Sequence, residues 1–209
     1  MKLSAIKQCC AMTNAARVVT DRNGDQWISN LVAMYRVSGV RIDEDAVVEL
    51  FGLTEKQVGK WILGEERVDN WQLDAYPTEE DVELTEIGRV MLAEATLIVL
   101  DGPGGLLMIN QDYVRPTRKE YRRYILREDG EQIPKVAVFE GVMCAALICP
   151  ISEHGNEKIQ ELAEAIAGRP WLALERGKCA ADAEVAAERV AASMGINCDT
   201  ERGMGCSRH

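Results

Sequence analysis

In the N-terminal part of the chain, over residues 1–60, the spacing of hydrophobic positions alternates between helical and extended. Leu3, Ile6 and Cys10 recur at helical spacing, which predicts a helix over residues 3–14 with Ser4 as its N-terminal cap. Asn23-Gly24 predicts a tight turn, because glycine adopts positive φ without strain. The other elements expected here are strands over 16–20, 26–30 and 32–37, and helices over 43–51 and 54–61.

A polar, acidic stretch over residues 74–86 separates this part from the next. Six of its thirteen residues are acidic and it contains Pro77, a composition typical of a solvated connector. After it we expect a helix from Thr85 to about Ala93, and then a hairpin over 95–110 that turns at Gly102–Gly105.

The second part resembles the first in order and spacing. Leu84-Thr85-Glu86-Ile87 matches Leu3-Ser4-Ala5-Ile6 in pattern, and each helix is followed by a strand, a turn and a strand that closes on asparagine. The interval between the two expected helix starts is nearly the same as the interval between the closing residues, Asn30 and Asn110. This pattern indicates an internal duplication, although helix followed by hairpin is also a common arrangement.

The remainder of the chain predicts more strand and then helix. Strands are expected over 135–140 and 142–149, whereas 121–127 fits either a strand or a helix. Helices are expected over 156–167 and 180–193, before a small, polar tail. We therefore expect an α+β fold of two similar helix-plus-antiparallel-sheet units, residues 1–73 and 84–168, which form one clamp-like domain. A helical appendage with a flexible tail would occupy 169–209.

Composition narrows the class of protein. The 209 residues carry a net charge of −10, which favours solubility and disfavours general adhesion to nucleic acid. No apolar run is long enough to span a bilayer and the first residues lack a signal-peptide core, so we expect a cytoplasmic protein with no membrane partner. Its seven cysteines are expected to be reduced and largely buried.

Catalytic and metal-binding sets are not evident in the sequence. With two histidines, the chain cannot form a multi-histidine metal centre. Gly102–Gly105 lacks the Lys-Ser/Thr of a phosphate-binding loop, so we interpret it as a turn. The thiols and histidine of the C-terminal tail have no recognised zinc spacing. We therefore expect no catalytic residues, no metal and no cofactor, and we rank an enzyme last.

One basic segment stands out against the acidic background. Its cationic residues are Arg115, Arg118, Lys119, Arg122, Arg123 and Arg127. Tyr113, Tyr121 and Tyr124 are interleaved with them, and arginine beside aromatic side chains suits contact with phosphate and stacking on bases. The alternative is an ordinary surface stripe that pairs with the acidic connector.

Two resemblances extend this interpretation. Residues 1–7 together with 25–35 (Asp-Gln-Trp-Ile-Ser-Asn-Leu-Val-Ala-Met-Tyr) resemble uncharacterised prophage and mobile-element proteins of Gram-positive bacteria. This resemblance covers residues 1–60 and implies a bacterial setting near DNA metabolism. The repeat pattern is similar to the half-domain of DNA sliding clamps, although this chain has length for only one clamp domain. Clamps carry basic residues on their DNA-facing helices.

These observations favour a non-enzymatic mobile-element protein that binds DNA, or a DNA-processing partner, through the basic segment. The alternative is an acidic interaction or inhibitor module that engages a basic protein through Glu79, Glu80, Asp81 and Glu83. Either function is compatible with an oligomer.

Overall fold

A computed structural model describes residues 2–68, 81–103, 105–127, 134–151 and 165–166. Contacts group residues 1–160 into one compact unit and 161–209 into another. In the second unit only Ala165 and Ile166 are described, and both are helical. The expected helix over 180–193 and the tail lie outside the described residues, as does most of the helix expected over 156–167.

The first part of the larger unit has the elements that its sequence predicts and one further strand, over 62–68, that it does not predict. They are α1 (Leu3–Thr13), β1 (Ala15–Asp21), β2 (Gln26–Ser29), β3 (Ala33–Val37), α2 (Glu44–Phe51), α3 (Glu55–Val58) and β4 (Ile62–Val68). Gly24 adopts φ +84° in the β1–β2 turn, as expected. Asp43 caps α2 by accepting a 2.8 Å hydrogen bond from the Ala46 N–H, and Gly52 ends the helix in the left-handed conformation.

The second part is built from strands and two short 3₁₀ turns. Its elements are β5 (Val82–Leu92), β6 (Ala95–Gly102), β7 (Gly105–Asn110), η1 (Gln111–Val114), η2 (Lys119–Tyr121), β8 (Arg122–Arg127), β9 (Lys135–Glu140) and β10 (Met143–Ile148). Gly102 pairs with Gly105, which confirms the expected hairpin turn. The ambiguous stretch over 121–127 is largely strand.

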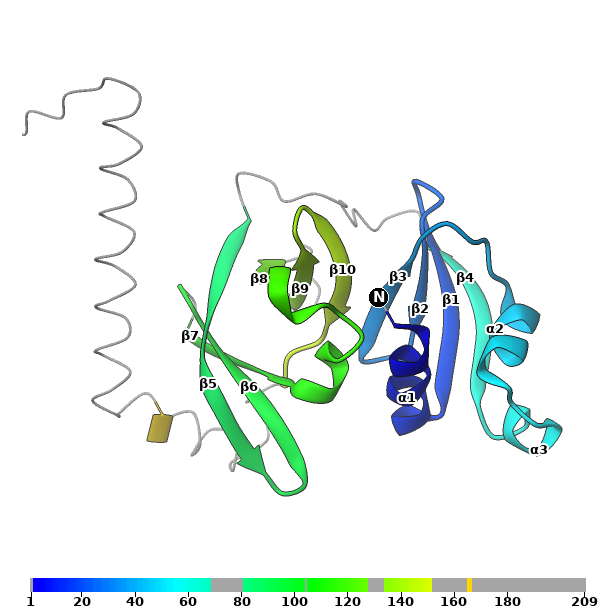
Figure 1. Cartoon of the computed structure of the whole chain (residues 1–209), viewed down its shortest axis with the longest axis horizontal. Coiled ribbons are helices and arrows are strands. Elements are labelled where there is room, and N and C mark those ends of the chain that lie inside the picture. The colour runs from blue at the N-terminus through cyan, green and yellow to red at the C-terminus, as the bar shows by residue number, and fades with distance from the viewer. Residues whose placement is uncertain (1, 69–80, 104, 128–133, 152–164, 167–209) are drawn as a thin grey trace, which may run out of the picture. The chain divides into compact units, whose positions relative to one another are not determined.

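One mixed sheet of ten strands connects the two parts, in the order β4-β1-β2-β3-β10-β9-β8-β5-β6-β7 (Figure 1). The β1–β4 pair is parallel and the others are antiparallel. The parts meet where β3 pairs with β10 over only three residue pairs, including Tyr35 with Ala146. After β10, the Ile151 N–H donates to the Met108 carbonyl of β7, so the second set of strands curls round on itself.

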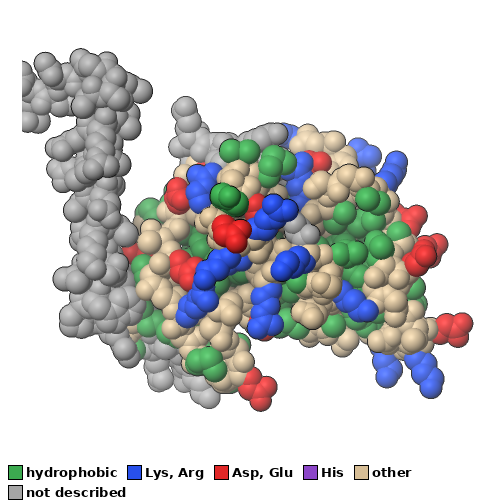
Figure 2. Space-filling view, viewed as in Figure 1, with side chains coloured by type: hydrophobic (Ala, Val, Ile, Leu, Met, Phe, Trp, Pro, Cys, Tyr) green, Lys and Arg blue, Asp and Glu red, His purple; other side chains and the backbone are tan. Residues whose placement is uncertain are grey.

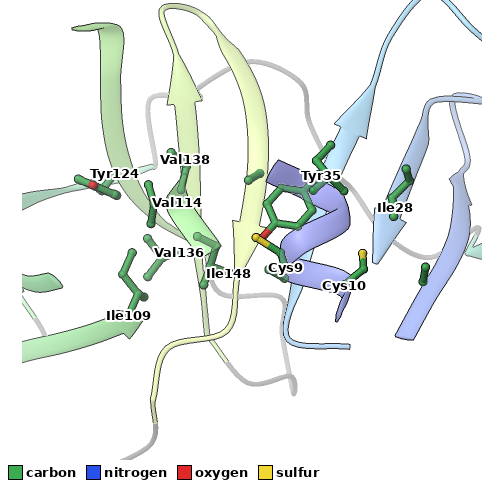
Figure 3. Close-up of a cluster of buried hydrophobic side chains, with 14 of the residues drawn as sticks. Cys9, Cys10, Ile28, Tyr35, Ile109, Val114, Tyr124, Val136, Val138 and Ile148 are labelled. Carbon is green, nitrogen blue, oxygen red and sulfur yellow. The ribbon is translucent and has the colours of Figure 1, made fainter. Parts of the chain in front are cut away.

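The main hydrophobic core draws on both parts. Cys9 and Cys10 of α1 and Tyr35 of β3 belong to the same buried cluster as side chains from η1, β8, β9 and β10 (Figure 3). A second cluster contains Trp27 and Phe139. Its residues alternate along the same strands with those of the first cluster, so they lie on the opposite face of the sheet. The sheet therefore buries side chains on both faces, and the clusters hold residues from both parts.

Three sequence predictions are wrong. The stretch 85–93 forms most of β5 and not a helix, and residues 82–86, expected to end the solvated connector, form the start of the same strand, with Leu84 buried. Residue 87 is the extra residue of a β-bulge between Glu86 and Gly88, which shifts the two-residue alternation of side chains along β5 by one residue and hides the strand pattern. Ser4 is also not the cap of α1, because the N-cap is Lys2 and no side-chain cap bond forms. The α+β class is confirmed, whereas the duplication and the clamp-like arrangement are not.

Candidate nucleic-acid interface

The basic segment follows a fixed path beside the start of α1. The Tyr35 hydroxyl donates a 3.0 Å hydrogen bond to the Tyr113 carbonyl, and the Cys9 thiol lies 3.3 Å from the Asp112 carbonyl oxygen. The Lys2 N–H donates to the Pro116 carbonyl at 3.2 Å. Residues 112–116 are thus anchored to α1 and β3, which lie far earlier in the chain.

Three of the six predicted cations are exposed: Arg115, Arg118 and Lys119. Arg115 forms a 2.9 Å ion pair with Asp112, and its side chain is still 60% exposed. Within the described part of the chain, neither Arg118 nor Lys119 forms an ion pair. These side chains therefore present positive charge to solvent.

Arg122 is directed to its own segment. Its guanidinium donates to the Val114 carbonyl at 3.1 Å, and to the Thr117 carbonyl and hydroxyl at 3.0 Å each. These hydrogen bonds fold η1 back against the start of β8. The contribution of Arg122 is therefore to shape the loop that carries the exposed cations.

Arg127 is also committed to the protein. Its side chain is 13% exposed, forms a 3.1 Å ion pair with Asp81 and stacks 5.4 Å from the Phe139 ring centre. Arg123 lies on the same face of β8 as Arg127, is half-buried, and donates to the Gly141 carbonyl at 3.1 Å. Asp81 belongs to the acidic stretch 74–86, so one acid of that stretch forms a largely buried ion pair with the basic segment.

The exposed cations gather with one more from the start of α1. Because the Lys2 backbone is bonded to Pro116, its exposed side chain starts beside Arg115 and Arg118. We call Lys2, Arg115, Arg118 and Lys119 the basic face. Figure 2 shows Lys and Arg side chains gathered over η1, η2 and the start of α1. Three acidic residues lie near the basic face. Asp112 pairs with Arg115, Glu120 follows Lys119 in the sequence, and the Glu140 carboxylate accepts the Arg118 N–H.

The three interleaved tyrosines have different environments. Tyr124 is buried and its hydroxyl lies 3.3 Å from the Glu86 carboxylate. Burial raises the pKa of Tyr124, an effect that nearby Arg122 opposes, and burial likewise raises the pKa of half-buried Tyr113. Tyr121, at the end of η2, is 66% exposed. Of the three, it alone presents its ring to solvent.

A cavity of about 410 Å³ adjoins the basic face. It lies beyond the last β3–β10 pair, where a bulge between Cys144 and Ala146 interrupts the β9–β10 register. Its lining includes Arg118 and Glu140, together with apolar Leu3 and Met143. Sequence reasoning missed this cavity, because its walls come from segments that are distant in the chain and share no local pattern.

The described residues offer little other chemistry. They contain no group of three or more His, Cys, Asp or Glu placed to hold a metal. Cys9, Cys10 and Cys144 are buried free thiols, as expected, and burial raises the pKa of Cys10 and of Cys144 to about 12. Such thiols are protonated at neutral pH and unsuited to nucleophilic attack. Both histidines and the remaining tail cysteines lie outside the described residues.

Comparison of the chain with models of protein families, with curated proteins and with solved structures finds no match. No helix within the described ranges is long and apolar enough to cross a membrane.

Proposed function

We propose that this protein is a non-enzymatic DNA-binding protein whose contact surface is the basic face. The observation that carries the proposal is the exposure of Lys2, Arg115, Arg118 and Lys119 around one anchored loop. Lysine and arginine side chains of this kind bind phosphate oxygens and release condensed counterions. A role in the DNA metabolism of a mobile element belongs to the same proposal.

The net charge of −10 shapes how such a surface would work. Repulsion from the rest of the molecule disfavours indiscriminate adhesion, so DNA would approach through the basic face. Arg122 supports this surface indirectly, because its hydrogen bonds shape the loop, whereas Arg127 is committed to Asp81 and Phe139 and takes no part in the surface. Binding would be modest and strongly dependent on salt.

The clamp-like relation between residues 1–73 and 84–168 is the finer part of the proposal. It is supported by a detail of the two hairpins, since β5 stands where the sequence predicts a counterpart of α1. Asn30 follows β2 and Asn110 ends β7, and the side-chain oxygen of each accepts the N–H two residues ahead, from Val32 and Asp112. The ten-stranded sheet also continues through both parts.

The test is DNA affinity measured by fluorescence anisotropy at 50 and 200 mM salt. Among the described residues, Lys2, Arg118 and Lys119 form no ion pair. If each neutralises one phosphate, log K should fall with log salt with a slope of about −3 on duplex DNA, or roughly 40-fold weaker binding at the higher salt. The double variant Arg118→Glu/Lys119→Glu should weaken binding at least tenfold at 50 mM. The matched control is Lys56→Glu/Lys60→Glu, which changes the net charge equally at exposed positions on or just after α3.

The control variant should bind within about twofold of the natural protein. Equal losses in the two double variants would show a net-charge effect and contradict the basic face as the site. No binding by the natural protein at 50 mM would contradict the proposed function as a whole.

A further inference from the structure

Tyr121 is exposed in a place where its backbone is held firmly. The Gly141 N–H donates to the Tyr121 carbonyl at 3.0 Å, and the Arg118 N–H donates to the Glu140 carboxylate at 2.7 Å. The Arg123 guanidinium adds a 3.1 Å bond to the Gly141 carbonyl. Three hydrogen bonds thus tie η2 and the start of β8 to the β9–β10 turn.

The same turn leaves a second apolar side chain in water. Val142, next to Gly141, is 63% exposed and Tyr121 is 66% exposed. Tyr35 and Tyr124, by contrast, are buried and their hydroxyls have partners in Tyr113 and Glu86. The described residues give the Tyr121 hydroxyl no hydrogen bond. Its ring is therefore an unused planar surface on a rigid support.

Two cations and a cavity lie next to the segment that carries Tyr121, although Tyr121 does not itself line the cavity. Lys119 is two residues before Tyr121 on η2, and Arg118 just precedes η2; both are members of the basic face. Arg118 and Glu140 also line the 410 Å³ cavity, whose volume lies within the ~300–1,000 Å³ range of small-ligand pockets. This region therefore combines cations that can bind phosphate with a ring on which a base can stack. The cavity nearby is partly apolar and offers a donor, Arg118, and an acceptor, Glu140.

We infer that the natural ligand of the basic face is single-stranded nucleic acid, with an unpaired base stacked on Tyr121 beside this cavity. The inference rests on the proposed function and narrows its ligand. Duplex DNA offers its phosphates to the basic face, but its bases are already stacked on each other and are inaccessible to Tyr121. Single strands expose the flat faces of their bases, and aromatic side chains bind these with little regard to sequence.

The experiment compares three probes by fluorescence anisotropy at 50 mM salt: a 20-nucleotide oligothymidine, a hairpin duplex and an abasic oligonucleotide. Tyr121→Ala should weaken oligothymidine binding by ~5- to 150-fold. It should change binding of the duplex and of the abasic strand by less than twofold. Tyr121→Phe and Tyr121→Trp keep an aromatic ring and should keep oligothymidine affinity, so they control for a loss of folding.

The results distinguish a failure of base stacking on Tyr121 from a failure of DNA binding by the basic face. If Arg118→Glu/Lys119→Glu weakens all three probes but Tyr121→Ala weakens none selectively, the stacking inference is overturned and DNA binding stands. If the natural protein binds none of the probes, both proposals fail. Equal or tighter binding of polyglutamate than of oligothymidine would overturn the inference in favour of an acidic protein partner.

Discussion

Arg122 and Arg123 are neighbours on β8, but Arg122 holds its loop with three hydrogen bonds whereas Arg123 makes one exposed bond. The same substitution at each position compares how much the two side chains contribute to stability. Glutamine removes the charge and is too short to reach the same acceptors. At position 122 it abolishes three hydrogen bonds to Val114 and Thr117; at position 123 it abolishes one exposed bond to Gly141. The change in net charge is the same in both variants.

The expected magnitudes follow from these bonds. Each net hydrogen bond contributes about 1 kcal/mol to stability, and solvent screening reduces the additional contribution of the charge. We therefore expect Arg122→Gln to lower the free energy of unfolding by about 3 kcal/mol, and Arg123→Gln to lower it by less than about 1 kcal/mol. Losing Arg122 should also raise the pKa of Tyr124 further, because Arg122 opposes the effect of burial on that phenol.

The assay is equilibrium unfolding in urea, followed by the fluorescence of the four tryptophans, one of which, Trp27, is fully buried. A shift of the unfolding midpoint, multiplied by the common slope, gives each difference in stability. Losses that agree within about 0.5 kcal/mol, or a larger loss at position 123, would refute the assignment of Arg122 to the architecture of the loop.

Two further predictions concern stability. Asn30 is buried and makes hydrogen bonds to Cys9, Val32 and Ala33, so Asn30→Ala should cost about 3 kcal/mol in urea unfolding; a cost below about 1 kcal/mol would contradict this. Burial raises the folded-state pKa of Cys10 from 9.0 to about 12. The unfolded chain therefore loses this proton first, and the stability that the protonated thiol contributes below pH 9 is lost as pH rises toward 12. The expected loss is on the order of 1 kcal/mol by pH 10. Melting temperatures from pH 8 to 10.5 should therefore fall less steeply for Cys10→Ala than for the natural chain, and parallel curves would refute the linkage.

Several parts of the fold were predictable because their signals are local. An aspartate before a helix and a glycine after it decide the ends of α2, since each satisfies backbone groups within a few residues. The β1–β2 and β6–β7 turns follow from glycines for the same reason. The identity of β5 could not be read this way, because the bulge at residue 87 shifts the alternation of its hydrophobic positions by one residue.

The candidate site was predicted in composition but not in arrangement. The sequence placed six cations and three tyrosines within residues 113–127. It could not show that Arg122 and Arg127 turn inward while Arg118 and Lys119 stay exposed, since each role depends on acceptors elsewhere in the fold. Nor could it show that Glu140 and Leu3 meet Arg118 at one cavity.

The sequence by itself thus determined the α+β class, most elements of the N-terminal part and the concentration of basic and aromatic residues in one segment. These follow from backbone preferences and hydrophobic spacing over short stretches of chain. Only the tertiary structure decided which of those side chains face solvent and which form hydrogen bonds or ion pairs within the protein. Burial and hydrogen bonding between distant segments make that choice, and neither is encoded in local spacing.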